Sequence, residues 1–222
     1  MILHGCGTMS RMHLDHLSFA VGPEGLEATT QRLSALLGVP FREGGFHPRF
    51  GTRNKILPLT DGQYLEVVEV LDHPAADKAP FGQAVRARSE DGGGWLGWVV
   101  AVDDIAPLEE RLGRAAVEGH RVLEDGTRLE WQQLGVKGLQ ADPQLPFFIS
   151  WRSAPAVHPS HGGREVELLK LEIAGDHERV DDWLGGRSDT ILHDVDIDWI
   201  APNGQPGLVA ALFSTPRGEV RI

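Results

Sequence analysis

The sequence predicts an α+β fold of repeated βαβββ modules, which form curved mixed sheets around a cleft and carry their helices on the outside. Two observations predict this fold. The order strand, helix, strands recurs three times along the 222 residues, as a pattern rather than as sequence identity. A unit of this size buries only one face of its small sheet, so neighbouring units must pack together to close a core.

The first repeat runs from a strand at residues 14–21 to a strand at residues 64–68. Between them, apolar residues spaced for one helical face predict a helix that ends at Gly38. Ile56-Leu57 belongs to a further strand, which joins the last strand through an Asp61-Gly62 turn. One more strand fits in the glycine-rich stretch before it. The apolar residues of the helix are Leu26, Leu33, Leu36 and Leu37.

The second repeat begins with a strand at residues 95–102 and continues into a helix that we expect to end at Gly119. Strands follow at residues 128–134 and 147–151, and Pro146 introduces the second of them. The apolar positions Ile105, Leu108 and Leu112 share one helical face. This repeat therefore has the same order of elements as the first.

The third repeat is shorter than the other two. It starts with a strand at residues 167–173, followed by a short helix that ends at Gly185-Gly186. Strands are expected near residues 192–199 and 208–213, and a turn at residues 215–218 leads to a last short strand. The sequence thus predicts a partial βαββ module at the C-terminal end.

Two segments rich in proline, glycine and charge, residues 72–94 and 152–164, separate the repeats and are interpreted as connectors. We therefore expect paired modules over residues 13–151 and a third, partial module over residues 165–222 that packs on them. Residues 1–12 precede the first strand and are expected to form a flexible leader.

Composition and charge argue against several classes of function. The 21 Lys and Arg residues face 32 Asp and Glu residues, and the net charge of −11 disfavours nucleic acid or an anionic membrane as a partner. No run of 18 uncharged apolar residues occurs, and the single cysteine, Cys6, can form neither an intrachain disulfide nor a zinc cluster. Nucleophile-elbow, phosphate-loop and dinucleotide-binding motifs are missing. We expect a cytoplasmic protein with a small-molecule ligand.

Strand alternation brings two ionisable side chains to one face of the first module. In the first strand Leu17 and Phe19 should meet the helix, which leaves His16 on the opposite face. In the strand at residues 64–68 the same rule places Glu66 on the face that His16 shares. Taken singly, a strand histidine bonded to a carbonyl and a surface carboxylate account for them; together they predict a shared cleft.

These residues resemble a known family. A strand that begins Asp15-His16, a helix that ends Leu37-Gly38 and a last strand Tyr64-Leu65-Glu66 are similar to a module of the vicinal oxygen chelate superfamily. That superfamily includes glyoxalase I, extradiol dioxygenases and antibiotic-resistance proteins. Three further segments resemble its subgroup called the glyoxalase-like domain, and the likeness covers nearly everything from His13 onward. These segments are HPRFGTRN at 47–54, LPFFI at 145–149 and HPS at 158–160.

The resemblance implies a divalent cation as a cofactor. In metal-dependent relatives each module supplies one ligand from its first strand and often one from its last strand. His16 and Glu66 match this pattern, whereas our alignment sets Gly97 and Ser150 at the corresponding positions of the second module. Three or more protein ligands usually hold a catalytic cation. The missing ligands are left to His47, His158 or water, which spacing alone does not rank.

Further residues are candidates for contact with a substrate. His47, Arg53 and Asn54 lie in a glycine-flanked stretch, where His and Asn can reach polar ligand atoms and an arginine suits a carboxylate or phosphate. A proline-built turn capped by Asn54 accounts for the same stretch equally well. His158 enters through the resemblance of its His-Pro-Ser motif, and Trp151 is expected in the cleft wall.

Two classes of function remain. The first is a glyoxalase-like enzyme that acts on a small oxygenated substrate by metal-assisted or acid/base lyase, isomerase or dioxygenase-type chemistry. The second is a non-catalytic protein of the bleomycin-resistance type, which binds or sequesters a small molecule. Relatives often pair modules between chains, which favours a homodimer. In the first hypothesis the catalytic residues are His16, Glu66 and His47, and the substrate-binding residues are Asn54, Arg53, His158 and Trp151.

Overall fold

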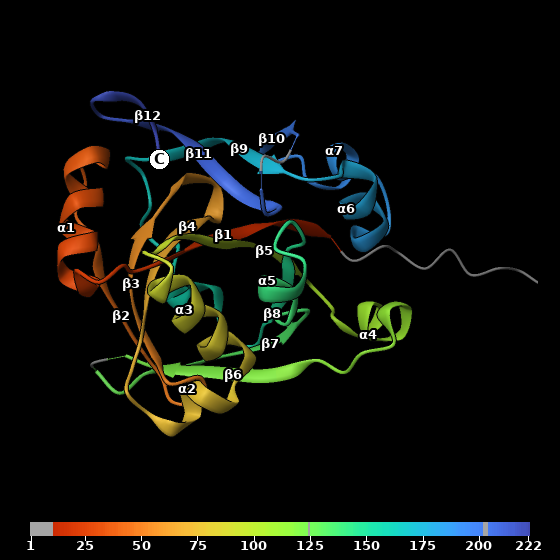
Figure 1. Cartoon of the computed structure of the whole chain (residues 1–222), viewed down its shortest axis with the longest axis horizontal. Helices are drawn as coiled ribbons and strands as arrows, with labels where there is room; N and C mark the ends of the chain where they lie inside the picture. Colours follow the sequence, from red (N-terminus) through yellow and green to blue (C-terminus); the bar gives the residue numbers. More distant parts are fainter. Residues whose placement is uncertain (1–10, 124, 202–203) are drawn as a thin grey trace, which may run out of the picture.

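Two sheets organise the part of the chain that the computed structural model describes, residues 11–123, 125–201 and 204–222. Within this part, eight strands close into a barrel (Figure 1). The strands are β1 (Met12–Ala20), β2 (Arg42–His47), β3 (Thr52–Pro58), β4 (Tyr64–Val70), β5 (Gly94–Val102), β6 (Val117–Val122), β7 (Arg128–Leu134) and β8 (Phe147–Trp151). Their order around the barrel is β1-β4-β3-β2-β6-β7-β8-β5.

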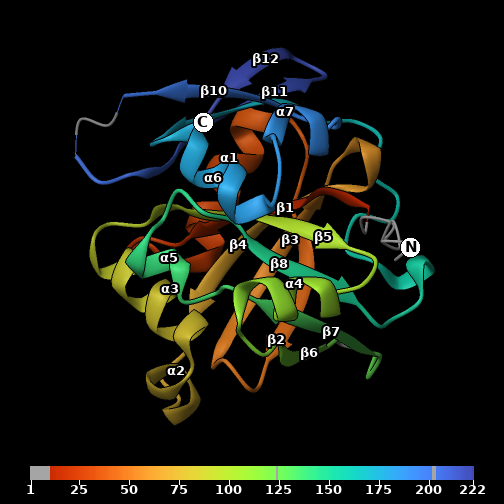
Figure 2. The same cartoon turned by 90° about the vertical axis from the view of Figure 1, so that its right-hand side faces the viewer.

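The remaining strands form a second sheet that lies across one side of the barrel (Figure 1). They are β9 (Glu167–Ala174), β10 (Asp196–Ile200), β11 (Gly207–Thr215) and β12 (Gly218–Arg221), in the spatial order β10-β9-β11-β12. The helices lie outside the barrel (Figure 2). They are α1 (Gly25–Leu37), α2 (Pro74–Lys78), α3 (Pro80–Glu90), α4 (Ala106–Leu112), α5 (Gly138–Ala141), α6 (His177–Leu184) and α7 (Ser188–Ile191).

The barrel consists of two halves with the same strand arrangement. β1 pairs in parallel with β4 in the first half, as β5 does with β8 in the second. β1 and β5 join the halves along an antiparallel seam, whereas β2 and β6 meet at one residue pair, Phe46 and Val122. The predicted α+β class with curved mixed sheets and outer helices is confirmed, and the sheet curves far enough to close on itself.

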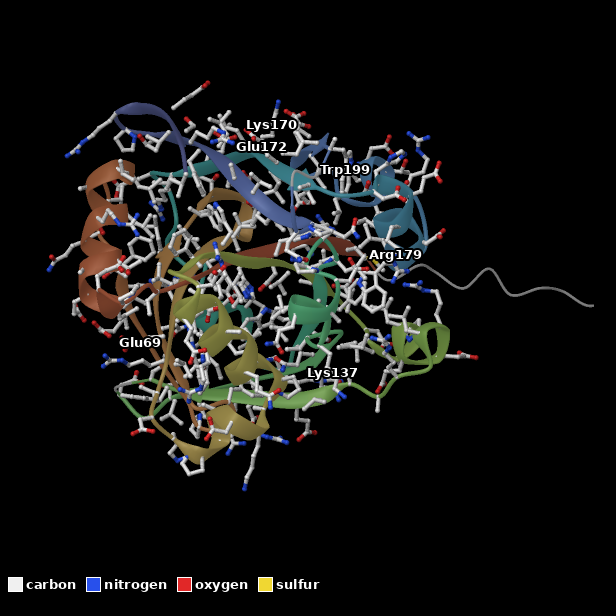
Figure 3. All side chains as sticks on the ribbon, viewed as in Figure 1. Glu69, Lys137, Lys170, Glu172, Arg179 and Trp199 are labelled. Atoms are coloured by element: carbon white, nitrogen blue, oxygen red, sulfur yellow. The ribbon has the colours of Figure 1, made fainter. Side chains whose placement is uncertain are left out.

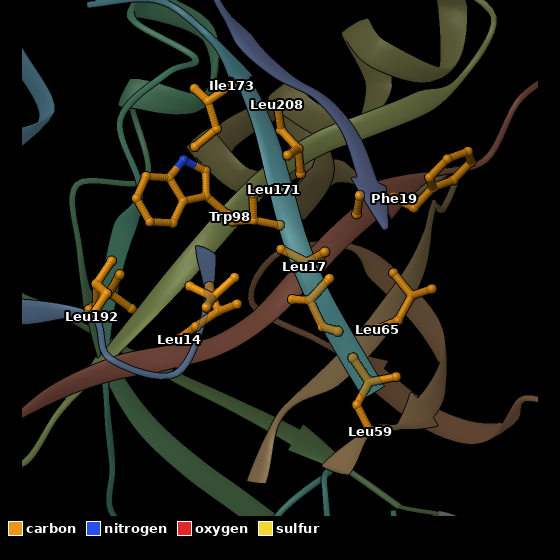
Figure 4. Close-up of a cluster of buried hydrophobic side chains, with 14 of the residues drawn as sticks. Leu14, Leu17, Phe19, Leu59, Leu65, Trp98, Leu171, Ile173, Leu192 and Leu208 are labelled. Carbon is orange, nitrogen blue, oxygen red and sulfur yellow. The ribbon is translucent and has the colours of Figure 1, made fainter. Parts of the chain in front are cut away.

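Alternation along β1 and β4 divides the core between the two sides of the barrel wall. Leu17 and Leu65 point outward and pack against Leu171 of β9, in a cluster that also takes in α1 and α6 (Figure 4). A second cluster lies on the inner side of the barrel wall and includes Val99 and Ile149. The far side of the second sheet carries polar residues such as Lys170 and Glu172, which point away from the barrel (Figure 3).

The segment interpreted as a connector at residues 72–94 is helical over most of its length, so that interpretation is wrong. Prolines occupy the first turns of α2 and α3, where the missing N–H costs nothing, and His73 caps α2 by accepting a hydrogen bond from Ala75 N. Phe81 and Val85 of α3 join the interior cluster of the barrel. The prolines mark helix starts here rather than an irregular linker.

The helix expected to end at Gly119 ends at Leu112, where Gly113 takes a left-handed conformation with φ 62. Gly119 belongs instead to β6, and a Cβ at this position would lie 2.4 Å from the Trp131 indole. The expectation of a helix end there is wrong, and the strand that carries Arg121 was missed with it. By contrast, the strand allowed for in the first glycine-rich stretch is β2.

Of the expected leader, residues 1–10 lie outside the described residues, and Met12 opens β1. The division into residues 13–151 and 165–222 stays a prediction. No helix in the described ranges is both long enough and apolar enough to cross a bilayer.

Candidate functional site in the barrel interior

The barrel encloses a cavity of about 400 Å3, counting the space open to solvent at its mouth. Its lining combines a few convergent polar side chains with a largely aromatic remainder, which is the usual composition of a small-molecule site. The polar part includes His16, Glu66, Asn54 and Arg121. The aromatic part is formed by Phe50, Phe81, Trp131, Phe147 and Trp151.

His16 of β1 and Glu66 of β4 both line this cavity. The parallel register pairs His16 with Tyr64 and Ser18 with Glu66, so the two ionisable side chains are neighbours on the inner face. His16 Nε2 lies 3.9 Å from Glu66 Oε2, and both residues are buried. The Tyr64 ring stacks on the imidazole at 4.4 Å between centroids, which fixes its orientation.

A bulge in β1 adds Asp15 to the same group. Leu14 pairs with Val100 and His16 with Val99, so Asp15 is an extra residue without a partner in β5. Its fully buried carboxylate lies 2.6 Å from His16 Nδ1 and accepts a hydrogen bond from it. Strict alternation places Asp15 on the face opposite His16, which is why the sequence pattern did not single it out.

The second oxygen of Asp15 accepts two more hydrogen bonds, from Trp151 Nε1 at 3.0 Å and His158 Nε2 at 3.2 Å. Because Ser160 N donates to His158 Nδ1, the imidazole proton of His158 is on Nε2. Burial raises the pKa of Asp15, but the hydrogen bonds that it accepts from His158 and His16 hold it well below its usual range. Asp15 is therefore an ionised carboxylate inside the protein.

Glu66 is held from both sides. Ser18 Oγ donates to its Oε2 at 2.9 Å, and Asn54 Nδ2 donates to its Oε1 at 2.6 Å. Burial raises the pKa of Glu66, but its electrostatic interaction with the neighbouring His16 and these hydrogen bonds leave it below its ordinary value. Gly44 makes room for this contact, since a Cβ there would lie 2.0 Å from Asn54 Oδ1.

Two other buried groups of the cavity are neutral. His47 Nδ1 lies 2.9 Å from Thr52 Oγ1, and burial lowers the pKa of His47 from 6.5 to about 4. Burial and the charges of Asp15 and Glu66 raise the pKa of Tyr64 well above its ordinary value, so its phenol keeps its proton. These groups offer uncharged hydrogen-bonding partners to a ligand.

Arg121 of β6 is a buried cation in the cavity lining, with 4% of its surface exposed. Its Nη1 donates to Asn54 Oδ1 over a long 3.4 Å, and its Nε has no hydrogen-bond partner. No carboxylate of the described residues forms an ion pair with it. Sequence reasoning missed Arg121 because β6 was missed, although the alternation of Gly119 and Arg121 on one face was a usable signal.

The barrel register corrects the alignment of the two modules. Val99 opposes His16 across the β1–β5 seam and pairs with Phe147 as His16 pairs with Tyr64. Ile149 lies two residues after Phe147 in β8, as Glu66 lies two residues after Tyr64 in β4, so Ile149 occupies the position that corresponds to Glu66. Gly97 and Ser150 are therefore not the counterparts, and the true counterparts are apolar.

This donor set does not fit a tightly held divalent cation. His16 and Glu66 supply two ligands, and both Glu66 oxygens and His16 Nδ1 already have partners. The second half of the barrel adds only Val99 and Ile149 at the matching positions. Across residues 11–123, 125–201 and 204–222, no group of three or more His, Cys, Asp or Glu side chains could hold a metal ion.

The other candidates divide into two groups. His47, Asn54 and Trp151 line the cavity, and His158 reaches its Asp15. Arg53 lies outside it and forms an ion pair with Glu69 at 2.6 Å. Most of the candidate residues therefore lie in or beside one cavity, and their roles stay predictions.

An outer groove adjoins the cavity. Phe50, Phe81 and Gln133 line both spaces, so these three side chains stand between the groove and the barrel interior. Three basic residues line the groove, two of which are labelled in Figure 3. They are Arg114, Lys137 and Arg179. Asp142 lines the groove as well and forms an ion pair with Arg179 at 3.2 Å.

The family model of the glyoxalase-like domain matches residues 14–185. No significant match to a curated protein was found. Because the matched region covers more than half of the chain, the resemblance drawn from the sequence motifs to the glyoxalase-like part of the vicinal oxygen chelate superfamily is confirmed.

A solved structure shares the fold of this chain. A hypothetical protein from Staphylococcus aureus superposes with a TM-score of 0.69 at 16% identity, over 93% of this chain and 92% of that chain. Methylmalonyl-CoA epimerase from Mycobacterium tuberculosis gives a TM-score of 0.43 at 17% identity, over 65% of this chain and 90% of that one. The latter similarity says nothing about the activity of this chain. By its sequence match and its fold, the chain belongs to the glyoxalase-like domain family.

Proposed function

We propose that the chain is a glyoxalase-like enzyme that moves a proton at a carbon next to the carbonyl group of a small molecule, with His16 as the acid/base residue. The observation that carries this proposal is the 2.6 Å hydrogen bond between Asp15 and His16. In the neutral imidazole that donates Nδ1–H to this carboxylate, Nε2 presents its lone pair to the cavity. A general base needs this state and this position.

The proton step balances within the cavity. Nε2 of His16 takes the proton, the C–H electron pair forms the enolate double bond, and the carbonyl pair moves onto oxygen. The imidazolium then returns the proton to the same carbon or to a neighbouring atom. The buried carboxylates of Asp15 and Glu66 lie 2.6 and 3.9 Å from the two ring nitrogens and stabilise this imidazolium.

Several candidate residues take positioning roles in this proposal. Trp151 and His158 hold the second oxygen of Asp15, and Asn54 holds Glu66. His47 is neutral at pH 7 and can bind the substrate without adding charge. No step of this proton transfer requires a metal, and Arg53 has no role in the proposed reaction.

Hydrogen exchange in D2O tests the proposal. A panel of small ketones and 2-oxo acids is incubated with the protein, and proton NMR follows the loss of signals next to the carbonyl. We expect exchange with the native chain. With His16→Gln the exchange rate should fall by about 100-fold or more, since general acid/base groups contribute on that order. His177→Gln, an exposed histidine of α6, is the matched control. Equal rates in native and His16→Gln protein would reject the proposal.

The aromatic lining favours a second candidate, a protein that binds an apolar ligand without reacting with it. In that case a member of the panel raises the melting temperature, yet none of its protons exchanges. Proton exchange would then be absent from both the native protein and His16→Gln.

A further inference from the structure

The Arg121 guanidinium is buried in the cavity without a counter-ion among the described residues. A buried charge is stable only when it is paired and its donors are satisfied. Asn54 lies between Arg121 and the nearest carboxylate: its Oδ1 accepts from Arg121, and its Nδ2 donates to Glu66. The amide keeps cation and anion apart and leaves most of the five guanidinium N–H donors unused.

From this arrangement we propose that Arg121 binds the carboxylate of the substrate, so that the ligand class is a small monoanionic carbonyl compound with an apolar body. The inference rests on the proposed function for the reaction at His16, but the anion site stands on its own geometry. The planar guanidinium can pair with a carboxylate through two parallel hydrogen bonds.

Charge in the cavity selects a single negative group. Asp15 and Glu66 are both ionised there and repel any anion, so a dianionic phosphate is opposed more strongly than a single carboxylate that pairs with the guanidinium. The remaining lining, which includes Phe50, Trp131 and Phe147, suits an apolar body. In a chain of net charge −11, Arg114 and Lys137 place positive charge along the outer groove that adjoins this cavity.

Binding measurements with matched probes test the inference. Pyruvate, 2-oxobutanoate and 4-methyl-2-oxopentanoate are each compared with their neutral amides and with inorganic phosphate, by calorimetry and by melting temperature. We expect at least one acid to bind the native chain about 10- to 100-fold more tightly than its amide, the range for charge-assisted hydrogen bonds. Phosphate should bind more weakly than that acid.

Variants separate a binding role from a structural one. Arg121→Met should lose the preference for acid over amide and raise the melting temperature without ligand, because an unpaired buried charge is replaced by an apolar side chain. Arg121→Lys should keep part of the preference. Arg128→Met, which removes an exposed arginine paired with Glu130, should change neither the preference nor the melting temperature by much.

The outcomes distinguish this inference from the proposed function. If an acid binds in an Arg121-dependent way but none of its protons exchanges, the anion site is supported and the proposed reaction is rejected. Proton exchange on a 2-oxo acid that Arg121→Met does not alter supports the reaction and overturns the anion site. The anion site is also overturned if no acid binds at millimolar concentration, if phosphate binds more tightly than every acid, or if Arg121→Met is strongly destabilised.

Discussion

Asp15 and His16 are consecutive residues whose side chains lie on the same side of β1, with Oδ2 and Nδ1 2.6 Å apart. A regular strand would point them to opposite faces, and the bulge opposite Val99 and Val100 allows the exception. The bulge thus converts a strand histidine into an imidazole with a buried carboxylate behind it. Both the proposed chemistry and the first prediction depend on this relationship.

Asp15→Asn should abolish most of the proton exchange while the protein still folds. Both side-chain oxygens of Asp15 accept hydrogen bonds, whereas an asparagine side chain has one accepting oxygen and a donating NH2 group. If the NH2 group faces His16, the ring proton of His16 must move from Nδ1 to Nε2. If it faces the other way, the hydrogen bonds from Trp151 and His158 are lost. We expect a fall in kcat of about 100-fold or more with little change in KM. Asp198→Asn, on the far sheet, is the control, and an unchanged kcat would contradict the role of Asp15.

His47 should make the protein less stable as the pH falls from about 6.5 to about 4. Burial lowers the pKa of His47 from 6.5 to about 4, so in this range the unfolded chain binds a proton that the folded chain does not. Stability therefore rises with pH across the range, and His47 contributes about 3 kcal/mol to the difference. Urea unfolding at several pH values measures it. His47→Gln should flatten this slope, and an unchanged slope would show that His47 is not buried neutral.

Divalent cations should bind the native protein no tighter than millimolar, since two of the expected ligand positions hold Val99 and Ile149. The double substitution Val99→His and Ile149→Glu should complete a four-ligand set with His16 and Glu66 and bind Zn²⁺ or Ni²⁺ on the order of micromolar. Calorimetric titration of chelator-treated protein checks both. Tight binding to the native chain that His16→Ala removes would contradict the fit derived from the register.

Leu171→Ala should destabilise the whole chain by about 2–5 kcal/mol, the usual cost of a large-to-small change in a core. Leu171 of β9 is fully buried against the outer side of β1 and β4, so the second sheet and the barrel share one core. Leu36→Ala removes the same atoms from a half-exposed position and is the control. Urea unfolding that shows two separate transitions, with only one affected, would mean that the two parts fold independently.

The sequence predicted those parts of the fold whose signals are local. Gly38 and Gly185 end their helices in left-handed conformations, as expected for glycine after a helical face. Alternation placed His16 and Glu66 on one inner face because β1 and β4 are regular between them. These features require no knowledge of how the halves of the barrel meet.

The parts that were missed depend on contacts distant in sequence. Gly119 looked like a helix end, but its role is to make room for Trp131 in the neighbouring strand. With β6 missed, Arg121 could not be placed. The register that sets Val99 opposite His16 contains two shifts along the β1–β5 seam, so alignment by pattern alone chose the wrong residues.

The protonation of His16 tests the central claim most directly. Two-bond ¹⁵N–¹H NMR spectra at about pH 8, with the His16 signals assigned by comparison with His16→Gln, show which ring nitrogen carries the proton. Asp15 as the acceptor predicts a proton on Nδ1 and a bare Nε2, and in Asp15→Asn a loss of this preference. A proton on Nε2 in the native chain would contradict the account, because the nitrogen that faces the cavity could then not act as the base.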